Sequence, residues 1–191
     1  ASSTNVVLRE IYGFLQAATV VEGSEPGAVE AGVVPLLVAH VEATGSNVAV
    51  ATLFNIALHS KERVDVVIEA GALRAVARIL TVMAGDASLG RFQKEKKYDD
   101  CVSFTSALAV GTKQCDSVVS SALPRLATAT LDSLMDNQEL CVAYLEMLQR
   151  LMSAHGSDKE DRSAAHVRTE RLAALRVARV VVGIMRRHQH A

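Results

Sequence analysis

The feature that most constrains this chain is a tripeptide, Glu-Ala-Gly, that occurs twice at a fixed distance. It stands at Glu30–Gly32 and again at Glu69–Gly71, so the second copy follows the first after 39 residues. Self-similarity with a period of this length is typical of helical repeat arrays, in which each repeat is one supersecondary unit. The spacing therefore predicts an all-α fold built from stacked units.

Composition agrees with closely packed helices and with a reducing compartment. Half of the residues are apolar, yet only 4% are aromatic, and small aliphatic side chains suit close helix contacts. The three cysteines form no Cys-x-x-Cys pair, which argues against a secreted disulfide framework. No apolar run reaches the roughly 20 residues that a membrane span needs, and no signal peptide is visible. We therefore expect an intracellular, cytoplasmic protein.

Residues that typically start or end helices divide the first copy of the repeat, residues 28–60, into three helices. Gly32 is predicted to end a short helix in a left-handed conformation. Pro35 falls in the first turn of the next helix, where its missing N–H costs nothing. Asn47 is expected to cap a third helix that ends at about His59. The predicted unit is a short, a medium and a long helix.

This unit resembles an armadillo repeat. The family places a glycine after the first helix, often a proline early in the second, and Leu-x-Asn-Ile/Leu-Ala at the end of the third. The matching residues here are Gly32, Pro35 and Leu53–Ala57. The resemblance extends over Ala28–Ser153 and is strongest over Ala28–Met83. It implies a right-handed α-solenoid, or superhelix, of armadillo-like three-helix repeats, with a groove lined by the third helices.

The same comparison divides the 191 residues into consecutive units of a single domain. The second unit is expected to contain an inserted loop at 85–100 that delays its third helix. A leading half-repeat with an exposed face predicts a fragment of a longer array that can self-associate through its N-terminal helix. The expected units are a half-repeat helix at 4–22, repeats at 28–60 and 61–113, a degenerate repeat at 116–153, and a C-terminal capping helix at 163–190.

Asn55 is the residue to which the resemblance assigns the clearest role. In the family an asparagine at this position often holds the backbone of an extended peptide, since its amide both donates and accepts hydrogen bonds. The alternative is a solvated polar residue, because its counterparts in the other units are Gly13, Ala109 and either Glu146 or Met147. The groove tryptophans of nuclear-import receptors are absent, which argues against recognition of basic import signals. The expected partner-binding groove consists of Thr52, Asn55, His59, Lys113, Glu146 and Arg150.

Two basic segments form a second candidate surface. The charged stretch around Lys94 is interpreted as a solvated insertion in preference to a binding loop. The last helix places arginines opposite an apolar face, which favours a capping helix over a site for anions or a membrane surface. A net charge of −1 disfavours nucleic acid as the partner. The residues of this surface are Arg91, Lys94, Lys96, Lys97, Arg168, Arg179 and Arg186.

Catalytic and metal-binding motifs are missing from the sequence. There is no Gly-x-Ser-x-Gly, no glycine-rich phosphate loop and no His-Glu-x-x-His, and the histidines and cysteines are not spaced as a metal-ligand set. We therefore expect a non-enzymatic scaffold or adaptor without cofactor or metal, binding a protein or peptide. One alternative is a co-chaperone or cytoskeleton-associated adaptor that docks a folded partner. The other is binding of an anionic surface or nucleic acid through the arginine face.

Overall fold

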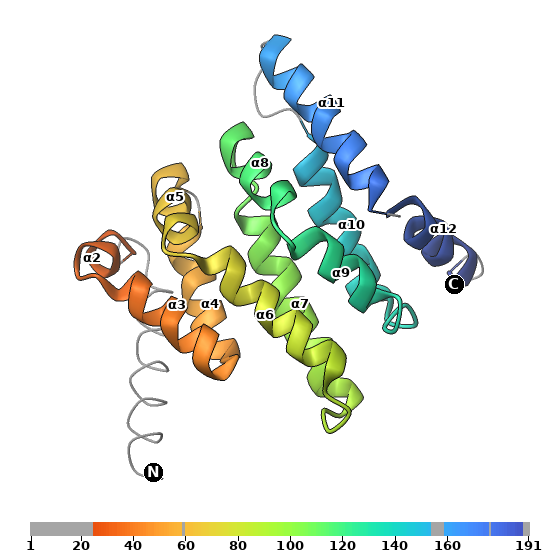
Figure 1. The fold of residues 1–191 in the computed structure, drawn as a ribbon, viewed down its shortest axis with the longest axis horizontal. Helices are drawn as coiled ribbons and strands as arrows, with labels where there is room; N and C mark the ends of the chain where they lie inside the picture. Colours follow the sequence, from red (N-terminus) through yellow and green to blue (C-terminus); the bar gives the residue numbers. More distant parts are fainter. Residues whose placement is uncertain (1–24, 59, 154–158, 176, 189–191) are drawn as a thin grey trace.

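The computed structural model describes residues 25–58, 60–153, 159–175 and 177–188, and every regular element in these residues is a helix (Figure 1). The protein therefore belongs to the all-α class, as its sequence predicts. The helices are α2 (Glu25–Glu30), α3 (Val33–Thr44), α4 (Asn47–Ala57), α5 (Lys61–Glu69), α6 (Ala72–Gly85), α7 (Arg91–Ala107), α8 (Thr112–Ser120), α9 (Leu123–Leu131), α10 (Gln138–Met152), α11 (Lys159–Ala174) and α12 (Val177–Arg187).

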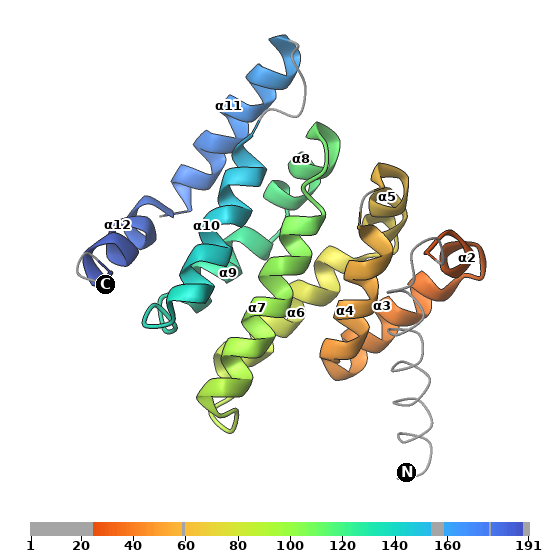
Figure 2. The same ribbon diagram turned by 180° about the vertical axis from the view of Figure 1, so that it is seen from behind.

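The helices pack in three columns, and neighbours within a column come from consecutive triplets of the chain (Figures 1 and 2). The first column contains α2, α5, α8 and α11, the second contains α3, α6, α9 and α12, and the third contains α4, α7 and α10. Stacked triplets of this kind enclose a core only together, since each one leaves apolar side chains for the next to cover. One cluster of buried side chains accordingly runs from Val34 to Ile184.

Glycine and proline stand where the repeat pattern predicts them. Gly32 has φ 70° and Gly71 has φ 94°, which is the left-handed region that favours glycine. Each of the two directly precedes the second helix of its triplet. Pro35 and Pro124 lie in the first turns of α3 and α9, where no hydrogen bond is lost. These local signals are confirmed.

The predicted cap of α4 is wrong by one residue, whereas α10 begins after an asparagine cap. Asn137 precedes α10 and accepts a hydrogen bond from the Leu140 N–H at 3.2 Å, as an N-cap residue does. At α4 the cap is Ser46, whose hydroxyl accepts from the Ala49 N–H at 3.3 Å. Asn47 is instead the first helical residue of α4. Serine and asparagine cap equally well, so the sequence did not distinguish the two positions.

The predicted loop at 85–100 is wrong, because α7 begins at Arg91 and only residues 86–90 connect it to α6. The first two turns of α7 are highly charged, but the side chain of Tyr98, which follows them, is completely buried. Its hydroxyl donates to the Ala127 carbonyl at 3.2 Å. Arg91 also pairs with Glu95 one turn later at 2.8 Å. The third triplet consequently starts with α8 at Thr112, before the predicted boundary at residue 116.

The single capping helix predicted at 163–190 is also wrong. The structure has two helices there, α11 and α12, with a turn at Leu175. Helix α11 packs on α8 and α10, and α12 packs on α9, so the two occupy the first and second columns. Their arginines and aliphatic residues fit one continuous helical wheel, and no glycine or proline marks the break. Packing on two different neighbours separates them.

Two predictions fall on residues outside the described part of the chain. The half-repeat helix at 4–22, with its proposed role in self-association, is one, and His59 is the other. Within the described residues, no helix combines the length and the apolar character that crossing a bilayer requires.

Candidate functional site

The face of the third column carries a cavity of about 320 Å³ that spans all three of its helices. Figure 2 shows α4, α7 and α10 side by side on this face. The walls combine apolar side chains with two serine hydroxyls and one charge of each sign, so the cavity can accept an apolar side chain and orient it by polar contacts. The lining residues are Phe54, Leu58, Ser103, Ser106, Ala107, Val110, Ala143, Glu146 and Arg150.

A stripe along α7 extends this face beyond the cavity. Ser103 and Ser106 line the cavity, and residues at helical spacing before them share their side of the helix. The first residue of the stripe, Phe92, is 78% exposed, which is unusual for an aromatic side chain. The stripe covers about 21 Å of helix axis and consists of Phe92, Lys96, Asp99, Ser103 and Ser106.

Two carboxylates of α7, Asp99 in this stripe and Asp100 beside it, lie in an environment that disfavours their charged forms. Loss of solvation raises the pKa of Asp99, and the negative charge of Glu139 on α10 raises it further. Loss of solvation likewise raises the pKa of Asp100, whose Oδ2 atom is buried and has no hydrogen-bond partner among the described residues. The face therefore contains negative charge that neighbouring side chains compensate incompletely.

Replacing Asp100 by asparagine is expected to stabilise the protein at neutral pH. Because folding raises the pKa of this carboxyl, its contribution to stability is present below the pKa of the unfolded chain, about 4, and is lost as the pH rises through the folded pKa. Asparagine stays neutral, so Asp100→Asn should exceed the wild type in free energy of unfolding at pH 7 and approach it near pH 3. Urea unfolding at both pH values measures this. Asp132→Asn, at an exposed carboxylate, is the control.

Three of the groove residues expected from the sequence lie on the third column. Glu146 and Arg150 are exposed on α10 and line the cavity. Asn55 is half-buried on α4, and its neighbours Phe54 and Leu58 contribute to the cavity wall. The structure thus brings α4 and α10 together around the same cavity.

Two other groove residues lie elsewhere. Thr52 is completely buried and its hydroxyl donates to the Val48 carbonyl at 2.8 Å, so the expectation that it lines a groove is wrong. Lys113 lies on α8, in the first column, and pairs with Asp65 of α5 at 3.3 Å. It therefore belongs to a different face from Glu146. A helical wheel of one repeat places residues on faces but does not tell which neighbour covers each face.

The basic residues assigned to a loop lie on α7 instead and do not form one free patch. Arg91 pairs with Glu95 at 2.8 Å and with Asp136 at 3.7 Å. Lys97 donates to the Gly45 carbonyl at 2.9 Å and thereby ties α7 to the turn between α3 and α4. Lys96 is exposed, and Lys94 is half-buried. Arg179 and Arg186 are exposed on α12, as expected for a surface.

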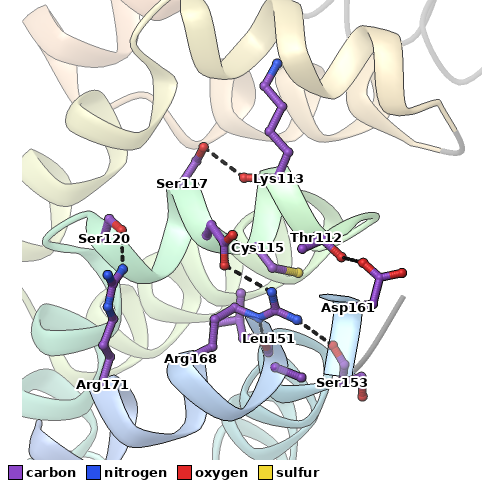
Figure 3. A network of polar contacts seen from close by, with 12 residues as sticks. Thr112, Lys113, Cys115, Ser117, Ser120, Leu151, Ser153, Asp161, Arg168 and Arg171 are labelled. Carbon is purple, nitrogen blue, oxygen red and sulfur yellow. Dashed lines mark hydrogen bonds and ion pairs between the residues drawn. The ribbon is translucent and has the colours of Figure 1, made fainter. Parts of the chain in front are cut away.

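Arg168 contradicts its prediction as a surface residue, because its side chain is only 1% exposed. Figure 3 shows its guanidinium enclosed between α8, α10 and α11. It donates to the Leu151 carbonyl at 2.7 Å, to the Ser153 carbonyl at 2.8 Å and to Asp116 at 3.0 Å. The carbonyls at the end of α10 have no intrahelical donor, so Arg168 caps this helix and holds α11 against it.

A related arginine occurs in an earlier triplet and leaves a signal in the sequence. Arg63 of α5 donates to the Ile56 and Leu58 carbonyls at the end of α4, just as Arg168 does for α10. Arg168 of α11 donates to Asp116 of α8. In the same way, Gln114 of α8 donates to Asp65 of α5, at 3.0 Å. The motifs Arg-x-Asp at 63–65, Gln-x-Asp at 114–116 and Arg-x-Glu at 168–170 mark these positions. Aligning them places Arg168 at the position equivalent to Arg63.

Neither the thiols nor the clusters of polar residues in the described part of the chain suggest a reactive centre. Cys101, Cys115 and Cys141 are buried thiols outside any disulfide. Burial raises the pKa of Cys115 to about 11 and raises the pKa values of Cys101 and Cys141 too, so at neutral pH all three are protonated and poor nucleophiles. No group of His, Cys, Asp or Glu within the described residues is arranged to hold a metal ion.

Comparison of the sequence with models of known protein families, and with curated proteins, gives no match. The site is therefore interpreted from its own geometry. The groove residues that sequence reasoning missed are Phe92 and the uncharged members of the cavity wall, and only the exposed aromatic within a charged run gave a signal for them.

Proposed function

We propose that this protein is a non-enzymatic interaction module, an armadillo-like right-handed α-solenoid that docks a segment of a partner protein on the face of its third column. The cavity shared by α4, α7 and α10 carries the proposal, because it offers apolar walls beside polar groups from three consecutive triplets. Exposed Phe92 and the incompletely compensated Asp100 extend the same face. A partner with apolar side chains and a nearby cation would complement these features.

The three-column packing supports the armadillo-like part of the proposal. Helices with the same place in consecutive triplets are neighbours, and left-handed glycines precede the second helices of two triplets. Three buried cysteines that form no disulfide suit a reducing compartment, and we retain the cytoplasm as the proposed location. A co-chaperone or cytoskeletal adaptor would use this face to dock a folded partner instead of a segment. Binding that survives proteolysis of the partner into peptides would favour a segment.

Partner capture with variants of this face tests the proposal. Ser106→Arg fills the cavity and Phe92→Ala removes the exposed ring, while both sites leave the core untouched. We expect these variants to lose at least about tenfold in affinity for the proteins that the wild type captures, since buried aromatic anchors dominate interfaces. Isothermal titration calorimetry with a captured protein gives the affinities.

The matched control for Phe92→Ala is Leu36→Ala. Leu36 is a comparably exposed apolar residue, 64% accessible, but it lies on α3 in the second column. The control should bind as the wild type does. If the captured proteins bind Ser106→Arg and Phe92→Ala with unchanged affinity, the third column is not the docking face.

Binding of nucleic acid through the arginine face receives less support. Arg168 is buried, Arg171 is bonded to Ser120 at 3.0 Å, and Arg187 is paired with Asp136 at 2.7 Å. Few of these charges remain to neutralise phosphates. A steep loss of binding with salt would nevertheless restore this alternative, because phosphate binding releases counterions.

A further inference from the structure

A second recess lies away from the third column, between the end of α9 and helix α12. These helices are neighbours in the second column (Figure 1). The recess has a volume of about 680 Å³ and an apolar floor made by Met135, Ala178, Val182 and Gly183. A Cβ atom on Gly183 would lie 3.2 Å from the Met135 sulfur, so the glycine allows α12 to approach this floor closely. The recess can therefore receive an apolar side chain.

One edge of this recess is cationic. Arg179, Arg186 and Arg187 line it from α12, a helix without any acidic residue. Arg187 pairs with Asp136 at 2.7 Å, whereas Arg179 and Arg186 are exposed and contact no hydrogen-bond or ion-pair partner among the described residues. These two are seven residues apart, about 10 Å along the helix, and flank Val182, which is 44% exposed. Two guanidinium groups without a partner among the described residues thus border an apolar surface.

We propose that this recess docks an acidic amphipathic helix of a partner protein. One apolar side chain of that helix packs on Val182 and Met135, and two carboxylates about two turns apart pair with Arg179 and Arg186. A guanidinium offers parallel N–H donors that match a carboxylate, so these two arginines select both the sign and the spacing of the partner's charges. This surface is separate from the cavity of the third column.

The charges around the recess favour a protein segment over a polyanion. Asp132 lines the recess from the end of α9, and Asp136 already occupies Arg187. These carboxylates would repel a continuous row of phosphates but leave room for two isolated carboxylates. A lipid surface, in turn, would need several protruding apolar side chains, whereas Val182, 44% exposed, is the one large exposed apolar side chain among the floor residues.

A library of displayed helical peptides, selected against the full chain, tests the proposal. We expect enrichment of peptides that carry Asp or Glu two turns apart on either side of an apolar residue. The double variant Arg179→Glu with Arg186→Glu should weaken these peptides at least about tenfold, and peptides with lysine in place of the acids should bind that variant instead. The control, Arg125→Glu with Arg162→Glu, changes two exposed arginines elsewhere and should bind as the wild type does.

Several outcomes would overturn the proposal. They are selection of peptides without the acidic pattern, selection of no peptide, and equal binding to the double variant. Oligothymidine and phosphatidylserine vesicles serve as further probes, and arginine-dependent binding of either without acidic peptides would assign the surface to a polyanion or a membrane. The variants Phe92→Ala and Ser106→Arg should leave the selected peptides unaffected, so failure here is distinguishable from failure of the third-column site. Circular dichroism melts verify that each variant is folded.

Discussion

Replacing Arg168 by alanine is expected to lower the free energy of unfolding by about 3 kcal/mol, because it leaves the buried Leu151 carbonyl and two half-buried acceptors without their donor. The guanidinium serves two carbonyls at the end of α10 and the carboxylate of Asp116 (Figure 3). Arg168→Lys should lie between wild type and alanine, since an ammonium cannot reproduce the planar fork that reaches all three. Urea unfolding followed by circular dichroism measures both variants.

Arg171→Ala is the matched control for Arg168→Ala. Arg171 lies on the same helix but is exposed, and it donates to the Ser120 hydroxyl at 3.0 Å. We expect a change below about 0.5 kcal/mol, as for most surface substitutions. If Arg168→Ala is as mild as this control, the capping role of Arg168 is refuted.

Phe104→Ala is expected to lower the free energy of unfolding by about 4 kcal/mol, which is typical when a buried phenylalanine is reduced to alanine. Phe104 is fully buried in α7, the middle helix of the third column, which packs on both α4 and α10. The cavity left by the ring would weaken both contacts together. Thermal and urea unfolding should show the loss without any change in the helical spectrum of the folded state.

The neighbouring Ser103→Ala provides the comparison. Ser103 lies on the cavity face and is half-buried, so its replacement should change stability by less than about 0.5 kcal/mol. Equal losses for Phe104→Ala and Ser103→Ala would mean that α7 does not connect its neighbours through Phe104.

Part of the candidate site could be predicted from the sequence. Glu146 and Arg150 of the degenerate repeat were expected in the groove, and both line the cavity from α10. Thr52 was misplaced because periodicity puts it near Asn55 without showing that the neighbouring helices bury it. The uncharged cavity wall has no local signature, since Ser103 and Ala143 become neighbours only when α7 and α10 pack.

Local chemistry was sufficient for the helix class and for the turns that divide the repeats. Gly32 and Gly71 adopt a backbone conformation that few other residues tolerate, and proline is compatible with a helix only in its first turn. The sequence alone therefore shows where these turns and helix starts fall. Three other features could not be predicted from the sequence: the start of α7, the break before α12 and the burial of Arg168. Each depends on a partner from another triplet, and whether a charged side chain faces water or a helix end is decided when the columns pack.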